Sequence, residues 1–251
     1  MPKWYYTLIA IWILIALVTF VILFKRVAPF GRHTQKGFGK LIPNRLGWIV
    51  MESPSIWLMA LLVILGPGEK TSTVWIIFGL FEFHYIHRTL IFPFRTRTAG
   101  KKMPMAIVFS AFGFQLVNVS LIGYVLGWHG EMFPDSWLTD GRFLLGLALF
   151  FVGMILNIRS DNTLISLRKP GETGYKIPKG GLFEWVTCPN FTGELLEWAG
   201  FALLSWNLAS LSFFIWSAAN LLPRAWAHHR WYLEKFPEYP KERKIVIPFL
   251  W

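Results

Sequence analysis

Long apolar runs alternate with short polar segments along this chain. Five separate runs are apolar over 16 to 22 residues: Trp4–Phe24, Leu46–Leu65, Thr73–Phe92, Met105–Leu126 and Phe143–Ile158. About 20 such residues cross a bilayer as a helix. The stretch from Leu195 to Trp226 would be about 48 Å long as one helix, which is too long. Trp206-Asn207 predicts a turn between two shorter spans, Phe191–Ser205 and Ala209–Trp226. The pattern therefore predicts an all-α integral membrane protein with seven transmembrane helices.

Basic residues gather in alternate connections. The segments 25–45, 93–104, 159–190 and the tail from Arg224 hold 21 of the 25 Lys and Arg residues. The other connections hold almost none, since 66–72 has only Lys70 and 127–141 has three acids. Cytoplasmic loops carry such an excess of Lys and Arg. Seven spans place all four basic segments on one side, so we expect an external N-terminus and a cytosolic C-terminus.

The composition agrees with a membrane protein. The 251 residues are 54% hydrophobic and 16% charged, which excludes disordered, collagenous and disulfide-scaffold classes. The net charge of +11 is spread between apolar runs, so we expect no nucleic-acid partner. Cys188 is the one cysteine of the sequence, and no HExxH or His-rich pattern occurs, so we expect no metal site.

Several ionisable residues fall inside the apolar runs, where a charge costs roughly 3 kcal/mol or more. Glu52 lies in the second run, where Pro54 breaks the helix locally. The third run carries the largest set: Glu82, His84, Tyr85, His87 and Arg88. The sixth carries Glu194 and Glu197, and the fourth carries Gln115 and Asn118, to which we assign no role. Glu52 is the strongest candidate for a functional residue, because no membrane interface explains it.

The segment 159–190 is the longest non-apolar stretch, and a loop of this length is usually functional. Arg168 and Lys169 offer contacts to phosphate, and Asp161 offers one to a ribose hydroxyl. No GxGxxG or P-loop motif is present, so a nucleotide would bind without a Rossmann unit. The residues alone thus indicate a polytopic membrane enzyme with an anionic cofactor.

Two long segments resemble the steroid 5α-reductase (3-oxo-5α-steroid 4-dehydrogenase) family. They are NIRSDNTLISLRKPGETGYKIPKGGLFEWVTCPNFTGELLEWAGFAL, from Asn157, and RAWAHHRWYLEKFPEYPKERKIVIPFLW at the end of the chain. HYIHRT at 84–89 and ESPS at 52–55 are similar to two further family motifs. We expect a microbial homologue.

The resemblance implies NADPH-dependent reduction of the C4=C5 bond of a 3-oxo-4-ene steroid. It implies that Glu52 and Tyr85 hydrogen-bond the 3-oxo group and that Arg88 supports them. The residues that it assigns to the NADPH pocket are Asn157, Asp161, Arg168, Tyr175, Asn190, Glu194, Trp198, Arg224, His228 and Tyr232. Residues 1–251 would form one polytopic domain, with the substrate-side residues in 1–130 and the NADPH-binding part in 131–251.

The chemistry of enone reduction fits these roles. Hydride addition at C5 drives negative charge onto the 3-oxo oxygen, so hydrogen-bond donors must already lie there. Tyr85 carries a hydroxyl donor, and Glu52 becomes a donor when protonated, which desolvation favours. A proton, expected from solvent, then adds at C4. Asn190 and Glu194 would bind the carboxamide of the nicotinamide.

The chain departs from the family pattern at two places. Met51 stands where the animal enzymes have Gln, which removes one polar contact near the carbonyl. The segment Thr96–Ala99 replaces the family's Asn-Arg-Gly-Arg, so its last arginine has no counterpart unless Lys101 or Lys102 substitutes.

Alternatives stay open at this point. A related reductase would take an enoyl-CoA or polyprenol lipid, and a relative of isoprenylcysteine methyltransferase would bind S-adenosylmethionine. A transporter predicts internal repeats or paired broken helices, and the sequence suggests neither. We expect a monomer that binds a steroid-like or enone lipid. Its membrane would be the endoplasmic reticulum in a eukaryote or the inner membrane in a bacterium.

Overall fold

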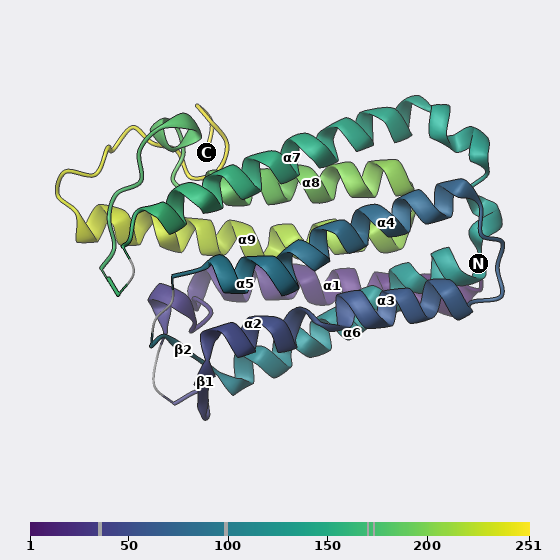
Figure 1. Cartoon of the computed structure of the whole chain (residues 1–251), viewed down its shortest axis with the longest axis horizontal. Coiled ribbons are helices and arrows are strands. Elements are labelled where there is room, and N and C mark those ends of the chain that lie inside the picture. Colours follow the sequence, from purple (N-terminus) through teal and green to yellow (C-terminus); the bar gives the residue numbers. More distant parts are fainter. Residues whose placement is uncertain (35–36, 98–99, 170, 173) are drawn as a thin grey trace.

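The computed structural model describes residues 1–34, 37–97, 100–169, 171–172 and 174–251. Its long helices lie side by side in an elongated bundle (Figure 1). The long helices are α1 (Lys3–Lys25), α3 (Pro54–Leu65), α4 (Ser72–Ile86), α6 (Met105–Trp128), α7 (Gly141–Ser166), α8 (Pro189–Ser205) and α9 (Leu208–Lys235). Shorter elements are α2 (Asn44–Glu52), α5 (Phe92–Arg95), strands β1 (Leu41–Pro43) and β2 (Lys102–Pro104), and single turns at Gly31–His33, Gly130–Met132, Asp135–Thr139 and Gly181–Glu184.

Four helices are long and apolar enough to cross a membrane. They are Lys3–Lys25, Asn44–Leu65 (α2 and α3 together), Met105–Trp128 and Gly141–Ser166. The predicted all-helical membrane class is therefore supported. The number of seven spans and the orientation of the termini stay predictions.

The predicted break in the second run is present, since α2 ends at Glu52 and α3 begins at Pro54. Proline has no N–H for the helical hydrogen-bond ladder, so the ladder is interrupted there. The third run is also uneven, because a π-helical turn at His87–Ile91 separates α4 from α5. A π-turn inserts extra backbone into a helix and re-aims the side chains beside it. Both irregular places lie next to predicted site residues.

Two predicted boundaries were wrong. The fifth run was expected to end at Ile158, but α7 continues to Ser166, so Asp161 lies on a helix and not in a loop. The seventh run was expected to end at Trp226, but α9 continues to Lys235 with Pro223 inside it. Apolarity marks only the part of a helix that contacts lipid or core, and the polar turns beyond it keep the same hydrogen bonds. The predicted turn at Trp206-Asn207 is confirmed, with Trp206 in the left-handed region at φ 39°.

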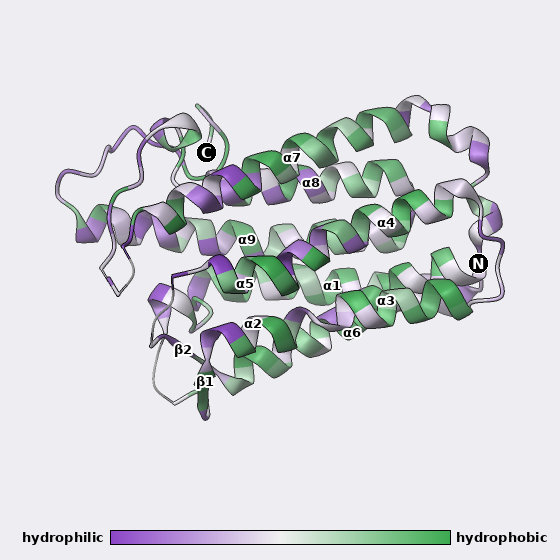
Figure 2. Cartoon of the chain, viewed as in Figure 1, coloured by the Kyte–Doolittle hydropathy of each residue, from purple (hydrophilic) through white to green (hydrophobic). Residues whose placement is uncertain are grey.

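Polar residues gather at one end of the bundle. The connections after α1, α5 and α7 and the tail after α9 all lie at that end, while the N-terminus lies at the other (Figures 1 and 2). Strands β1 and β2 pair antiparallel there, with Ile42 opposite Met103. Lys36, Thr98 and Ala99, which belong to the predicted basic segments and to the family departure, lie outside the described residues. The basic segments that are described thus share one end.

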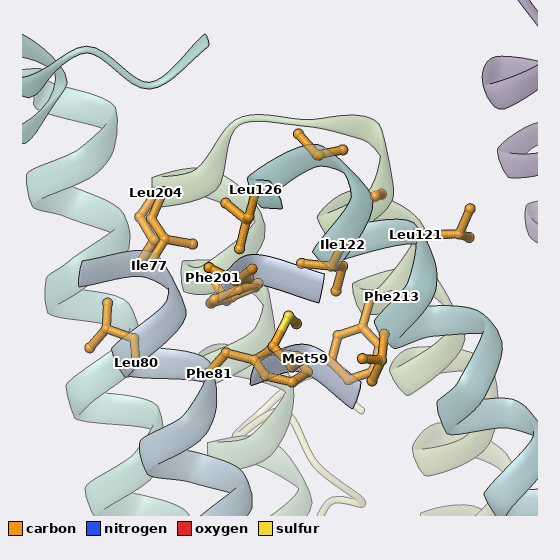
Figure 3. Packing of buried hydrophobic residues seen from close by; sticks show 14 of the residues in the cluster. Met59, Ile77, Leu80, Phe81, Leu121, Ile122, Leu126, Phe201, Leu204 and Phe213 are labelled. Atoms are coloured by element: carbon orange, nitrogen blue, oxygen red, sulfur yellow. The ribbon is translucent and has the colours of Figure 1, made fainter. Parts of the chain in front are cut away.

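The apolar core lies between α3, α4, α6, α8 and α9 (Figure 3). Met59, Phe81, Ile122 and Phe201 are fully or almost fully buried there. Large apolar side chains on α1, such as Leu14 and Val21, are instead exposed, as expected for a helix that faces lipid. Trp12 of α1 donates its ring N–H to Asn118 on α6, which fixes this outer helix to the core.

Helices α7 and α8 approach each other backbone to backbone. A methyl group at Gly153 would lie 2.3 Å from the Glu197 nitrogen, and one at Gly193 would lie 2.4 Å from the Asn157 nitrogen. Gly146 and Gly200 repeat the arrangement one heptad away along each helix. Small residues permit such close packing of helices in membranes. Asn157 of α7 and Glu194 of α8 are brought together as a result.

Candidate functional site

Glu52, Gln115 and Tyr85 meet in the interior of the bundle, from α2, α6 and α4. Gln115 Nε2 donates to Glu52 Oε2 at 2.7 Å and lies 3.2 Å from the Tyr85 hydroxyl oxygen. Tyr85 is 3% exposed and Gln115 is 5% exposed, whereas Glu52 is only partly buried. The two predicted catalytic residues therefore share one hydrogen-bonded cluster, and Glu52 keeps accessible surface toward which a ligand group could point.

Arg88 joins this cluster to α7 and α8. Its guanidinium lies 3.6 Å from Asp161 Oδ2 and 3.6 Å from Glu194 Oε2, and it stacks over the rings of Trp48 and Phe92 at 4.8 Å. A buried cation held by two carboxylates and two aromatic faces has little freedom to move. Arg88 therefore keeps α4, α7 and α8 in register.

Amide and carboxylate groups line the junction of α7 and α8. Asn157 Nδ2 donates to the Asn190 carbonyl at 3.0 Å and to Glu194 Oε2 at 3.3 Å. Asn190 Nδ2 donates to Asp161 Oδ1 at 3.1 Å. This set of donors and acceptors is suited to a flat amide such as a carboxamide, which needs one donor and one acceptor.

A cavity of about 270 Å³ opens beside these residues. Its wall joins segments from the whole length of the chain: Phe30, Trp48, Arg88, Phe92, Thr96, Arg97, Asp161, Leu164, Ile165, Arg168, Asn190, Phe191, Leu221, Arg224 and His228. Trp48 precedes Glu52 by one helical turn, and Arg88 follows Tyr85 by about one turn. Two residues of the cavity wall therefore lie about one helical turn from Glu52 and Tyr85, which are not themselves part of that wall.

Tyr175 lies at the centre of a cluster of three cationic side chains. The guanidinium groups of Arg32 and Arg168 lie 5.1 Å and 5.3 Å from its ring centre, and Lys101 Nζ lies 4.7 Å from that centre. Lys101 also donates to the Tyr175 hydroxyl at 3.3 Å, whereas Lys102 is exposed on β2. Lys101 is thus the better placed of the two lysines to replace the missing family arginine.

Several buried nitrogens of this face have no acceptor among the described residues. They are Arg32 Nη1, Arg168 Nη1, Arg224 Nη1 and His228 Nε2. A buried donor without an acceptor lowers the stability of the folded protein. We therefore expect a ligand with oxygen atoms to accept hydrogen bonds from these nitrogens. Four arginines line the cavity against one aspartate. The residues present therefore fit a phosphate-bearing ligand.

His33 lies beside this cationic face and stacks on His228 with ring centres 5.3 Å apart. Burial first, and then the charges of Arg224 and Arg32, lower the pKa of His33 to about 4. The imidazole is therefore neutral at physiological pH. An anion bound between Arg32 and Arg224 would reduce the effect of their charges on the pKa of His33.

Nine of the ten predicted cofactor residues fall into three groups. Asp161, Arg168, Asn190, Arg224 and His228 line the cavity. Asn157 and Glu194 support that wall through the hydrogen bonds given above, and Tyr175 and Tyr232 stack on Arg32. Trp198 differs, because it is 2% exposed and packs in the core against His84 at 4.4 Å and Tyr85 at 5.8 Å.

Residues that received no role in the sequence also belong to the site. Gln115 links the two predicted catalytic residues, and Arg32 contacts Tyr175, Trp231 and Tyr232. The sequence positions of Gln115 and Arg32 do not indicate these contacts, because their partners lie far away along the chain. Glu197, one turn from Glu194, faces away from the cavity and lies 2.7 Å from His84 Nδ1, tying α4 to α8.

Comparison with known proteins places the chain in a family. A family model described as 3-oxo-5-alpha-steroid 4-dehydrogenase matches residues 101–251. A steroid 5-alpha-reductase of Gossypium hirsutum is 42% identical over 98% of this chain and 97% of its own length. The 3-oxo-5-alpha-steroid 4-dehydrogenase 1 of Macaca fascicularis is 45% identical over 88% of this chain and 84% of its own, and the Homo sapiens protein of that name is 44% identical over 88% and 85%. The chain therefore belongs to the 3-oxo-5-alpha-steroid 4-dehydrogenase (steroid 5-alpha-reductase) family of oxidoreductases.

Proposed function

We propose that this oxidoreductase uses NADPH to reduce the C4=C5 double bond of a 3-oxo-4-ene steroid to the 5α-dihydro product. One observation carries the proposal beyond the family name. A carboxyl group and a phenol, Glu52 and Tyr85, are held together in an apolar interior beside an arginine-lined cavity. Two potential proton donors at one place are suited to a ketone oxygen that gains charge.

Each chain residue has a defined part in this proposal. Glu52, in its protonated form, and Tyr85 donate hydrogen bonds to the 3-oxo oxygen and stabilise the negative charge that develops there. A bound NADPH supplies the hydride that adds at C5. Apolar core residues around the cluster exclude water from the reacting carbonyl. A proton from solvent adds at C4 and completes the saturated product.

The cofactor side follows from charge and burial. Arg168 and Arg224 would neutralise phosphate groups, and their buried Nη1 atoms would find acceptors there. Asn157, Asn190 and Glu194 would hold the carboxamide, while Tyr175 and Tyr232 would keep Arg32 in place. Asp161 would accept from a ribose hydroxyl, His228 would complete the wall, and Trp198 would support Tyr85 from the core. Residues before 130 also contribute to the cavity, including Phe30 and Trp48.

The same proposal places the protein in the membrane. Seven spans would set the polar end of the bundle, with its cavity, on the cytosolic side, where NADPH is available. The steroid would enter from the bilayer and the cofactor from water. We also propose that the enzyme is a monomer.

The test is turnover by the detergent-purified protein with NADPH and progesterone. We expect oxidation of NADPH together with a product that is two hydrogens heavier by mass spectrometry and has 5α stereochemistry. NADPH binding without steroid turnover would contradict the substrate assignment and direct the search to enoyl thioesters. Absence of NADPH binding would contradict the cofactor assignment as well, and S-adenosylmethionine would be the next ligand to measure.

A further inference from the structure

Gln115 touches both acids of the proposed site and is itself buried. Its Nε2 atom donates to Glu52 Oε2 at 2.7 Å and reaches the Tyr85 hydroxyl oxygen at 3.2 Å. The Tyr85 hydroxyl in turn donates to Gln115 Oε1 over a longer distance, 3.4 Å. An amide nitrogen carries two hydrogens, and the two shorter contacts use both of them. Gln115 therefore donates to each acid.

The backbone around Gln115 is held firmly. One turn farther along α6, Asn118 accepts from the Trp12 ring N–H at 3.1 Å and donates to the Phe114 carbonyl at 2.8 Å. Phe114 packs against the Trp216 ring with centres 5.2 Å apart. Helix α6 is thus fixed to α1 and α9 at this level, and the Gln115 amide has a defined position.

The two hydrogen bonds from Gln115 determine which oxygen atoms of Glu52 and Tyr85 can donate a hydrogen bond to a ligand. Because Glu52 Oε2 accepts from the amide, the proton of a neutral Glu52 belongs on Oε1. The Tyr85 oxygen accepts the second amide hydrogen, and its own O–H donates to Gln115 Oε1 only over 3.4 Å, so a ligand oxygen at a shorter distance would replace that weak acceptor. A ketone oxygen accepts two hydrogen bonds, which matches one from each acid.

We propose that Gln115 is a positioning residue that orients the proton-donating atoms of Glu52 and Tyr85 toward the 3-oxo oxygen of the substrate. This inference rests on the proposed function. Met51, beside Glu52, does not take this part, because its side chain is buried with Met103 and Val108. The polar contact absent at position 51 is therefore supplied from a different helix.

The test compares Gln115→Met, which keeps the size and removes the amide, with Gln115→Glu. We expect Gln115→Met to lower kcat roughly 10- to 100-fold while KM for NADPH changes less than about twofold. Gln115→Glu donates one hydrogen only when protonated, so its rate should rise as pH falls from 8 to 6 more steeply than that of the unaltered enzyme. Met51→Leu is the control, a buried neighbour outside the cluster that should keep kcat.

A second measurement does not depend on turnover. In the complex with NADP⁺ and progesterone, the infrared stretch of the 3-oxo group should shift to lower frequency, and Gln115→Met should reduce that shift. If Gln115→Met does not fold, the pH profile of Gln115→Glu tests the positioning role of Gln115 instead. Unchanged kcat and an unchanged carbonyl shift in Gln115→Met would overturn the role of Gln115 while leaving steroid reduction intact. Loss of binding and turnover in the unaltered enzyme would overturn the proposed function and this role together.

Discussion

A polar side chain inside an apolar bundle must find its hydrogen-bond partners among other groups of the protein, because no water replaces them. Glu52, Gln115 and Tyr85 meet this requirement with one another, and Arg88 forms ion pairs with Asp161 and Glu194. Each group therefore has a defined neighbour, and the effect of removing that neighbour can be measured. At the scale of single residues, the proposal is tested by changing one donor or acceptor at a time.

The protonation state of Glu52 separates two possible roles. Glu52→Gln keeps a hydrogen-bond donor at nearly the same place, whereas Glu52→Ala removes it. If Glu52 donates, Glu52→Gln should keep more of kcat/KM for progesterone than Glu52→Ala, by roughly tenfold or more for one donor in such a site. Equal losses in both variants would argue that Glu52 acts as an ionised carboxylate.

Arg168 and its neighbour Lys169 offer a matched comparison. Arg168 lines the cavity with one buried nitrogen that lacks an acceptor, whereas Lys169 is exposed. A charge-assisted hydrogen bond contributes about 1.5–3 kcal/mol, so Arg168→Ala should raise KM for NADPH roughly 10- to 100-fold. KM for steroid should change little. Lys169→Ala should leave both constants near their original values, and a larger effect there than at Arg168 would contradict the phosphate assignment.

His33 gives a pH dependence of stability. Its pKa in the folded protein is about 4, below the usual value of about 6.5 for histidine. The unfolded chain therefore takes up a proton first as pH falls from about 6.5 to about 4, and the folded state loses stability through that window. His33→Gln should show a smaller fall in thermal midpoint between pH 7 and pH 5. Identical falls in both proteins would exclude His33 as a source of acid sensitivity.

At the scale of elements, α7 and α8 form a rigid pair through their glycines. This contact places Asn157 and Asp161 of α7 against Asn190 and Glu194 of α8. The site is thus a product of helix packing, and it should be sensitive to side-chain size at positions that touch no ligand.

Gly193→Ala tests that dependence. The added methyl would lie 2.4 Å from backbone of α7, and overpacking of this kind costs about 1–3 kcal/mol or more. We expect a lower thermal midpoint and weaker NADPH binding. Gly113→Ala on α6 is the control, because its methyl would meet nothing within 4 Å and alanine favours a helix. Equal behaviour of the two variants would contradict the packing argument.

The elements also differ in how far their sequence predicts them. The apolar runs, Pro54 and Trp206-Asn207 carry local signals, and these predicted the helices, the break and the turn. The continuation of α7 to Ser166 carries no apolar signal, so it was missed. The pairing of Glu52 with Tyr85 was expected from family motifs alone. Gln115 and Arg32 were missed because their contacts depend on how distant helices pack.

At the scale of the whole molecule, polar and apolar residues are separated along the bundle axis. Polar residues gather toward one end of the bundle (Figure 2), and the cavity is lined by residues of the connections and helix ends that meet there, such as Phe30, Arg97 and Arg168. Such a division lets a hydrophobic substrate and a charged cofactor approach from different surroundings. Trp48 and Arg88 of the cavity wall lie about one helical turn from Glu52 and Tyr85 of the hydrogen-bonded cluster.

The last residues of the chain belong to that polar end. Thr187 and Cys188 donate from their backbone to Lys244 and Ile245, at 2.8 Å and 3.0 Å. Ile245 and Val246 are buried in a cluster with Phe191, a residue of the cavity wall, and Trp251 packs against it. The tail is therefore part of the wall that supports the proposed cofactor site.

The packing of Trp251 against Ile245 and Val246 has a practical consequence for labelling the protein. An affinity tag or fluorescent reporter fused directly after Trp251 should strain the wall, with a lower thermal midpoint and weaker NADPH binding. An epitope inserted after Gly39 should leave both unchanged, because residues 37–40 are exposed and a side chain at Gly39 would meet nothing within 4 Å. Comparing the two labelled proteins would show where a probe can be attached for purification or imaging.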